Sequence, residues 1–227
     1  MKVQQLEHLK QILPATPGIL GKAEYCNTAI LVLLMLINGE YHFVFQKRNS
    51  QIRQGGEVSF PGGIFDPGKD KTFEETAIRE TIEELGIPEN KITIIGVLDT
   101  LVHPTGLTID ACLGVTHITS IDEMTINSSE VEYVFTVPVA YFEKTEPDKY
   151  NINIKFHPSY IDGETGEEIN LFPARQLGLP EMYTRPWGIG KHNVLVYQVQ
   201  NEVIWGITAK FVYDVVKKIK SAQNVCK

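Results

Sequence analysis

The sequence predicts an α/β fold, and three patterns support this prediction. The dipeptide Asn38-Gly39, which is preferred in two-residue hairpin turns, lies between two apolar runs. A helix is predicted over residues 72–85, because helical start and stop signals flank that segment. Segments rich in Val, Ile and Thr, which are typical of strands, follow at residues 91–98, 109–117 and 131–137.

The N-terminal part of the chain is predicted to form a helix and then a hairpin. Apolar residues recur at helical spacing over residues 2–13, and Pro14 ends the pattern. Residues 29–36 and 41–46 flank the turn and form two antiparallel strands. The longest apolar run has nine residues, about half of what a membrane-spanning helix needs. We therefore interpret it as a buried strand.

Both ends of the central helix can be identified from single residues. Thr72 followed three residues later by Glu75 is a capping box, which satisfies backbone N–H groups in the first turn. Gly86 is typical of the position after the last helical residue, because glycine adopts a left-handed conformation without steric cost. The side chains predicted to bury this helix against a sheet are Phe73, Ala77, Ile78, Ile82 and Leu85.

Residues 143–190 are predicted to be a loop-rich insertion. Charged and turn-forming residues interrupt every period there, and no continuous core pattern appears. A chain of 227 residues is long for one α/β domain and short for two. We therefore predict one domain over residues 1–227, with an N-terminal helical extension over about 1–25 and this insertion. The remaining predicted elements are strands at 193–199 and 202–205 and a helix from about residue 208.

The composition is typical of a globular protein, and its charge leads us to expect no nucleic-acid or membrane partner. Lysine and arginine total 21 against 28 acidic residues, and the net charge of −7 disfavours nonspecific binding to nucleic acids or anionic membranes. Cys26, Cys112 and Cys226 show no C-x-x-C spacing, and the N-terminal residues lack the apolar core of a signal peptide. We expect a cytoplasmic protein.

Three carboxylates on the central helix indicate a metal site. Glu80 is followed by Glu83 and Glu84 at spacings of three and four residues, so the three side chains lie within reach of one another. Like charges at this spacing repel, and a divalent cation would remove the repulsion. Oxygen ligands without a nearby histidine or cysteine suit Mg²⁺ or Mn²⁺. The alternative is a solvated acidic face with Arg79 paired to Glu75 or Glu83.

The run Arg79-Glu80-x-x-Glu83-Glu84-x-Gly86, which follows the Gly62-Gly63 loop, resembles the signature of the Nudix hydrolases. The resemblance implies an α/β/α sandwich with a mixed β-sheet. It also implies an enzyme that hydrolyses phosphorus-containing acid anhydrides, acting on a nucleoside diphosphate linked to another group. Glu80, Glu83 and Glu84 would be the ligands of Mg²⁺ or Mn²⁺. The glycine pair Gly62 and Gly63 would let the backbone approach a ligand or metal closely.

The chain departs from the Nudix pattern in the loop before the helix. The segment between Gly63 and Arg79 is two residues longer than usual, and no glutamate occupies the early position that the family pattern expects. One acidic contact is therefore unassigned, with Asp66 and Asp70 as possible replacements. Thr81 also stands where a bulky aliphatic residue is usual.

A second resemblance concerns the substrate. Residues 47–60 carry Arg48 and Arg53 ahead of glycines and run into Pro61-Gly62-Gly63. Such a positive loop suits phosphate groups, although by itself it could equally serve solubility. In this context it is similar to the extra motif of the coenzyme A diphosphatase branch. The resemblance implies that Arg48 and Arg53 bind phosphates of coenzyme A, which is cleaved to 4′-phosphopantetheine and adenosine 3′,5′-bisphosphate.

The implied mechanism is metal-assisted hydrolysis. The metal clamps the diphosphate and lowers the pKa of a bound water, and Arg79 fixes a glutamate by an ion pair. A further carboxylate takes the proton from water. Glu130 and Glu132 are the candidates, with Glu130 favoured, because they lie at the start of a strand after a loop. The predicted catalytic residues are Arg79, Glu83, Glu84 and Glu130.

Two alternatives remain open for the function. One is a Nudix hydrolase of another nucleotide derivative, such as ADP-ribose or a dinucleoside polyphosphate. The other is a non-catalytic Nudix-like domain that senses a nucleotide. Such a domain would be expected to have lost part of the carboxylate set, which is complete here. The expected partner is a small-molecule nucleotide, and membership of this family would also be compatible with a homodimer.

Overall fold

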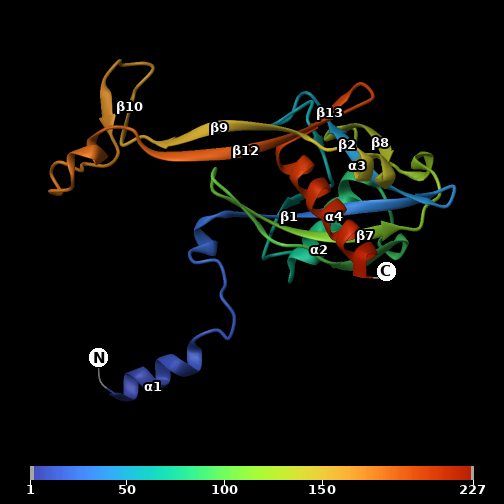
Figure 1. Ribbon diagram of the computed structural model, residues 1–227, viewed down its shortest axis with the longest axis horizontal. Coiled ribbons are helices and arrows are strands. Elements are labelled where there is room, and N and C mark those ends of the chain that lie inside the picture. The colour runs from blue at the N-terminus through green and yellow to red at the C-terminus, as the bar shows by residue number, and fades with distance from the viewer. Residues whose placement is uncertain (1–2, 226–227) are drawn as a thin grey trace. The chain divides into compact units, whose positions relative to one another are not determined.

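The computed structural model describes residues 3–225, and the chain divides into two compact units (Figure 1). Unit 1 comprises Met1–Gly55 and Phe60–Thr136, and unit 2 comprises Gly56–Ser59 and Val137–Lys227. The predictions for Met1, Lys2 and Cys226 concern positions outside the described residues. The prediction of a single domain stays a prediction.

Unit 1 contains a mixed β-sheet in which β2, β1, β7 and β5 lie side by side in that order. β1 (Cys26–Ile37) pairs antiparallel with β2 (Glu40–Arg48) and parallel with β7 (Leu107–Thr116), whose other neighbour, β5 (Ile92–Val97), is antiparallel. The mixed sheet and the α/β class are therefore confirmed. Three further strands pair alongside this order, namely β4 (Gly62–Ile64) beside β1, β6 (Leu101–His103) beside β7, and β8 (Val131–Pro138), which begins in this unit, beside β2.

The hairpin turn and both ends of the central helix form at the predicted residues, but the predicted capping box forms only in part, because the Glu75 side chain accepts from the Lys71 N–H at 2.6 Å. Asn38 and Gly39 have φ values of 51° and 85°, as the tight hairpin turn requires. The helix α2 (Phe73–Leu85) begins after Thr72, whose Oγ1 accepts a hydrogen bond from the Glu75 N–H. It ends at Gly86, which has a φ of 66°. The other helical segments of unit 1 are α1 (Val3–Ile12), η1 (Lys22–Glu24), η2 (Glu89–Lys91) and η3 (Ile121–Glu123).

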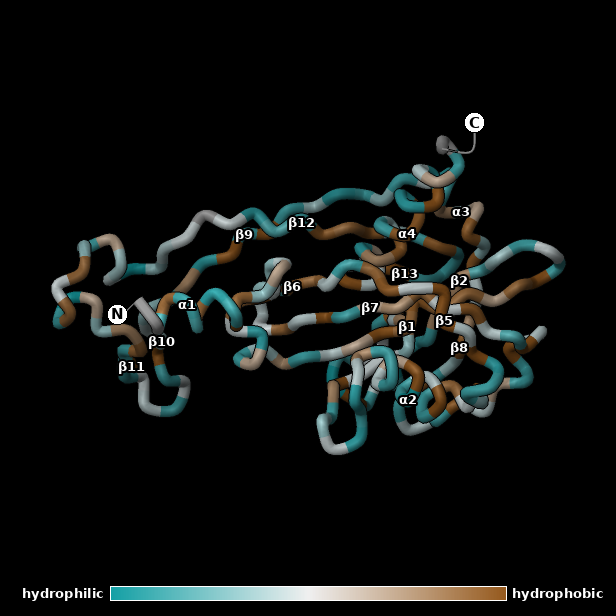
Figure 2. Tube along the Cα trace, turned by 90° about the horizontal axis from the view of Figure 1, so that it is seen from below, coloured by the Kyte–Doolittle hydropathy of each residue, from teal (hydrophilic) through white to brown (hydrophobic). Residues whose placement is uncertain are grey.

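The core of unit 1 lies between α2 and the sheet. The helix packs against β1, β4 and β7 and buries Ala77 and Leu85 among side chains of β1. Figure 2 shows hydrophobic residues along these strands and hydrophilic ones in the loops. Thr81 is fully buried, and its hydroxyl donates to the Ala77 carbonyl at 2.7 Å. A polar residue is tolerated at this position because its hydroxyl bonds within its own helix.

Gly86 is predicted to be sensitive to substitution for two separate reasons. Its φ is positive, and a Cβ there would lie 2.4 Å from the Thr125 carbonyl oxygen. We expect Gly86→Ala to lower the free energy of unfolding by about 2 kcal/mol or more, measured by urea denaturation. Gly39→Ala is the control, because Gly39 has positive φ but no heavy atom within 4 Å of the added Cβ. Equal losses at both positions would contradict the role given to the Thr125 contact.

Unit 2 is built on an antiparallel sheet with the order β13-β12-β9. The helix α4 (Gly206–Val225) packs against β12 and β13, and α3 (Val139–Lys144) packs against α4. Phe142 and Tyr197 meet edge-to-face with ring centroids 5.0 Å apart. The strands and the short helix of this unit are β3 (Val58–Ser59), β9 (Asp148–Phe156), β10 (Ser159–Ile161), β11 (Glu168–Asn170), β12 (Trp187–Val199), β13 (Glu202–Trp205) and η4 (Glu181–Thr184).

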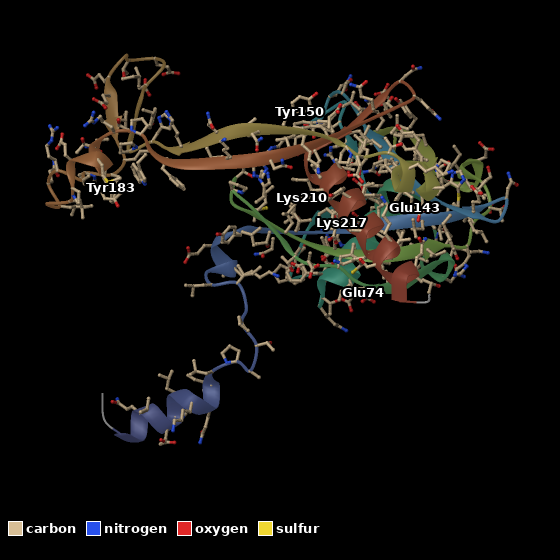
Figure 3. The ribbon with its side chains drawn as sticks, in the orientation of Figure 1. Glu74, Glu143, Tyr150, Tyr183, Lys210 and Lys217 are labelled. Carbon is tan, nitrogen blue, oxygen red and sulfur yellow. The ribbon has the colours of Figure 1, made fainter. Side chains whose placement is uncertain are left out.

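Residues 143–190 contain more regular structure than the sequence predicts. β9 pairs with β12 along a ladder that runs from Asp148 opposite Val196 to Phe156 opposite Trp187, and β10 pairs with β11. In Figure 3, Tyr150 lies on the ribbon formed by β9 and β12, and Tyr183 lies at the far end of that ribbon. The ladder is missed because β9 is largely exposed on both faces, so its sequence lacks the apolar pattern of a core strand.

The helices of the described part of the chain are too short or too polar to span a membrane. Among residues 3–225, none combines the length and the apolar character that crossing a bilayer needs.

Candidate active site

Arg79 on α2 is the centre of the candidate site. Its Nε and Nη2 donate to the two carboxylate oxygens of Asp70 at 2.8 and 2.9 Å. Its Nη1 donates to Glu80 Oε1 at 2.7 Å and to Glu83 Oε2 at 3.2 Å. One planar guanidinium therefore orients three carboxylates, with a two-point contact to Asp70. The Arg79–Glu83 pair of the alternative interpretation is present, but the Arg79 side chain is only 20% exposed and also bonds Asp70 and Glu80, so this face of the helix is not simply solvated.

Asp70 supplies the acidic contact for which the sequence left two candidates. Its side chain is 2% exposed and also accepts hydrogen bonds from the Thr76 hydroxyl and the Asp66 N–H. Arg79 and these donors hold the pKa of Asp70 far below its usual range. The Asp66 carboxylate instead accepts from the Gly68 N–H at 2.9 Å. The Asp70 N–H donates to the Asp66 carbonyl at 2.7 Å, so the longer loop folds into a closed turn.

Glu80, Glu83 and Glu84, called the metal set below, differ strongly in their solvation. Glu83 is 52% exposed, whereas Glu80 is 15% exposed. Burial raises the pKa of Glu80. The Arg79 guanidinium opposes this increase, and the nearby Glu83 and Glu130 carboxylates add to it. The Glu84 side chain is buried and accepts from the Gly62 N–H at 3.0 Å. Burial raises the pKa of Glu84 to about 7, so a cation beside it would favour its ionised form.

The glycine pair before the helix allows close approach of the backbone to the metal set. A Cβ on Gly63 would lie 2.3 Å from Glu80 Cδ, and a Cβ on Gly62 would lie 2.3 Å from the Ala29 carbonyl oxygen on β1. Both positions therefore exclude a side chain. The structure gives these two predicted substrate-binding residues a further role, which is to place β4 directly against the acidic helix.

A cavity of about 440 Å³ opens beside the carboxylates. Glu80 and Glu83 line it together with Arg79, and Glu130 joins them from a segment far along the chain. Glu132, the other candidate base, is exposed on β8 and is absent from the lining. The loop before α2 supplies the rest of the lining, namely Ile64, Phe65, Asp66, Pro67 and Lys69.

The two predicted phosphate-binding arginines lie outside this cavity lining. Arg53 is exposed, and its carbonyl accepts a hydrogen bond from Arg48 Nη2 at 3.4 Å. Arg48 is half-buried and near enough to Glu84 to favour the ionised form of that carboxyl, which lowers its pKa slightly. The structure thus brings Arg48 near the metal set and leaves Arg53 at the surface.

Three polar residues near the site were missed by sequence reasoning: Gln46, Asn49 and Asn127. Gln46 on β2 is fully buried and its amide favours the ionised form of Glu84, although neither amide atom completes a well-aligned hydrogen bond. Asn49 and Asn127 bond to the turn that carries Glu130. Asn followed by Ser is typical of turns in which the side chain accepts a backbone N–H. That signal predicts a turn but not its partner.

The donor chemistry of the site fits a hard divalent cation. Four carboxylates line one cavity, from Asp66, Glu80, Glu83 and Glu130, and they outnumber the two cationic residues of the lining, Lys69 and Arg79. Carboxylate oxygens without nitrogen or sulfur donors suit Mg²⁺ or Mn²⁺. Within residues 3–225, no three acidic, histidine or cysteine side chains already have the spacing of a metal site. Glu80 and Glu83 are instead bonded to Arg79, so a cation would compete with the guanidinium for them.

The chain is similar in sequence to a known family and to several of its members. The family model described as NUDIX domain matches residues 28–187. Nudix hydrolase 3 of Caenorhabditis elegans is 35% identical over 150 residues, which are 61% of this chain and 59% of that protein. Mitochondrial coenzyme A diphosphatase NUDT8 of Homo sapiens is 33% identical over 131 residues, 57% of this chain and 55% of that protein. This chain therefore spans less than two thirds of the length of either relative.

Among solved structures, a Nudix hydrolase from M. smegmatis, RenU, is 21% identical, with a TM-score of 0.44 over 51% of this chain and 72% of that one. The family model itself covers more than half of the chain and includes the whole of α2 with its acidic run. On this match, the chain belongs to the Nudix family.

Proposed function

We propose that this protein is a metal-dependent Nudix diphosphatase that cleaves coenzyme A to 4′-phosphopantetheine and adenosine 3′,5′-bisphosphate. The observation that carries the proposal is the Arg79 cluster, in which one guanidinium orients Asp70, Glu80 and Glu83 at a cavity that Glu130 also lines. The similarity to NUDT8, which is named a coenzyme A diphosphatase, supports this choice of substrate.

Each group of the site has a separate task in this proposal. The metal set would hold Mg²⁺ or Mn²⁺, which supplies charge neutralisation for the diphosphate and a lowered pKa for a bound water. Arg79 orients Glu80 and Glu83 through the ion pairs described above. Glu130 accepts the proton from the attacking water, for which its exposed carboxylate at the cavity wall is available. Arg48 and Arg53, which lie outside the cavity lining, would bind phosphate groups of the substrate that extend beyond it, by charge-assisted hydrogen bonds.

The test is incubation of the purified protein with coenzyme A, ADP-ribose or a dinucleoside polyphosphate, each with Mg²⁺, Mn²⁺ or EDTA, followed by chromatography of the products. We expect metal-dependent release of adenosine 3′,5′-bisphosphate from coenzyme A. Glu83→Gln is expected to lower the rate about 100-fold or more, because it removes one ligand charge from the metal set. Glu83 is half exposed, so this variant should keep its melting temperature.

Glu74→Gln is the matched control, because Glu74 is an exposed glutamate on the same helix, outside the cavity lining. It should hydrolyse coenzyme A at the wild-type rate. Cleavage of ADP-ribose or the dinucleoside polyphosphate alone would contradict the coenzyme A assignment and leave the diphosphatase chemistry standing. Tight nucleotide binding without turnover of any substrate would contradict the enzyme and favour the sensor.

A further inference from the structure

Glu130 is carried by a turn whose backbone is held by Asn127. The Asn127 carbonyl accepts hydrogen bonds from the N–H groups of Glu130 at 2.9 Å and Val131 at 2.8 Å. Its side-chain Oδ1 accepts from the Ser129 hydroxyl at 2.6 Å and the Ser129 N–H at 3.2 Å. Main-chain and side-chain groups of one residue therefore fix the path of the backbone into Glu130.

The same turn is tied to the end of α2. The Asn127 N–H donates to the Glu84 carbonyl at 2.9 Å, and the Thr125 N–H donates to the Leu85 carbonyl at 3.1 Å. Carbonyls in the last turn of a helix have no partner within the helix and are open to such bonds. These hydrogen bonds therefore fix the position of the Glu130 turn relative to the helix that carries the metal set.

Asn49 holds the turn from its other side. Its N–H donates to the Glu130 carbonyl at 2.8 Å, and its Nδ2 donates to the Ser128 carbonyl at 2.8 Å. Its Oδ1 accepts from the Gln51 N–H at 3.0 Å, at the start of the segment that leads to Arg53. A side-chain amide donates and accepts at once, which neither an alkyl group nor a carboxylate does. One side chain thus joins the Glu130 turn to the basic segment.

The Glu130 side chain itself is weakly restrained. It is exposed, and its contact with Asn127 Nδ2 is long, at 3.5 Å. Its placement at the cavity therefore depends on where the backbone of the turn lies. A shift of about 1 Å in a reacting group can lower a rate about 100-fold.

We propose that Asn49 and Asn127 are positioning residues that hold the Glu130 carboxylate at the reaction site, and that their effect on catalysis passes through Glu130. This inference rests on the proposed function. It assigns no contact with substrate to either asparagine.

The test is a double-mutant cycle with Asn49→Ala and Asn127→Ala, each made in the wild type and in Glu130→Gln, with kcat and KM for coenzyme A as readouts. In the wild type we expect each substitution to lower kcat about 10-fold or more. In Glu130→Gln we expect each to change kcat less than about 2-fold, because the group that they position is already disabled. Equal fold losses in both backgrounds would show a general structural role and overturn the inference.

Ser128→Ala is the matched control. It alters a side chain in the same turn and keeps the carbonyl to which Asn49 donates. It should leave kcat within about 2-fold of the wild type.

Hydrogen–deuterium exchange supplies a readout that does not need turnover. In Asn127→Ala and Asn49→Ala, amides in residues 125–131 should exchange faster, while those of α2 keep their protection. Unchanged exchange in both variants would overturn the inference whatever the kinetics show. If the wild type hydrolyses no nucleotide, the proposed function fails separately, and the exchange data still decide whether the asparagines hold the turn.

Discussion

Asp70→Asn is expected to lower the free energy of unfolding by about 3 kcal/mol at neutral pH. The substitution removes the charge from a carboxylate that is 2% exposed and bonded at both oxygens to Arg79. The asparagine amide group would also point N–H donors at a guanidinium that has only donors of its own. Breaking a buried ion pair on one side costs about 3–5 kcal/mol, and the loss here lies at the lower end because Arg79 keeps its contacts with Glu80 and Glu83. Urea denaturation of both proteins measures the difference.

The pH dependence of that difference has a definite sign. The pKa of Asp70 is far lower in the folded protein than its ordinary value of 3.8. The stabilisation from the ionised form is therefore complete above about pH 4 and is lost as the pH falls through the folded pKa. Wild type and Asp70→Asn should differ most between pH 6 and 7 and converge in acid, as far as denaturation can be followed.

Asp66→Asn is the control for Asp70→Asn, since Asp66 lies in the same loop and was the other candidate for the contact with Arg79. Its carboxylate accepts a backbone N–H and lies 4.0 Å from Lys69 Nζ, and an asparagine keeps the first of these contacts. The expected loss is below about 1 kcal/mol. A loss as large as that of Asp70→Asn would contradict the assignment of Asp70.

Glu84→Gln is expected to lower metal-dependent hydrolysis about 100-fold or more while stabilising the metal-free protein at alkaline pH. The amide keeps the size of the side chain and an oxygen that can accept from the Gly62 N–H. It removes a buried carboxyl whose ionisation is unfavourable in the folded protein. The rate falls because one charged ligand of the metal set is lost.

The stability effect again follows from the pKa. Burial raises the pKa of Glu84 from 4.5 to about 7 in the folded protein. When folding raises the pKa of a carboxyl group, the free energy of unfolding is greatest below the pKa of that group in the unfolded chain. It falls as the pH rises through the pKa of the group in the folded protein. The wild type in EDTA should lose about 3 kcal/mol between pH 4.5 and 8 through this group, and Glu84→Gln should not.

Adding Mg²⁺ at pH 8 should close most of this gap. Saturation to about 100 times the dissociation constant stabilises a binding protein by about 2.7 kcal/mol, and the variant should gain less. Glu83→Gln is the control, because Glu83 is half exposed and should not show the alkaline stabilisation. If the free energy of unfolding in EDTA depended on pH in the same way for the wild type and Glu84→Gln, that result would contradict the buried state of Glu84.

Features set by local backbone chemistry were predictable from the sequence. The hairpin at Asn38-Gly39 and the helix between Thr72 and Gly86 depend on conformations that single residue types favour, and both formed as predicted. The parallel pairing of β1 with β7 joins segments far apart in the chain, so no local pattern predicts it. β9 was missed for a related reason, since its register depends on β12 rather than on its own composition.

The same division applies to the candidate site. The closeness of Glu80, Glu83 and Glu84 was predictable because helical spacing fixes it. The choice of Asp70 over Asp66 was not, since it depends on how an irregular loop folds back onto Arg79. The roles of Asn49 and Asn127 were also hidden, because most of their partners are backbone N–H and carbonyl groups, which carry no signal in the sequence.

Because the turn from Asp66 to Asp70 is closed, the geometry of the site does not depend on the length of the loop before α2. The ends of this turn meet through the Asp70 N–H and the Asp66 carbonyl, while Pro67, Gly68 and Lys69 are exposed between them. Because the ends of the turn meet, the two residues by which this loop exceeds the usual Nudix spacing can be accommodated here without moving the carboxylate that meets Arg79. A sequence pattern that requires a fixed number of residues between Gly63 and Arg79 therefore fails to match chains in which the ion pair between Asp70 and Arg79 is intact.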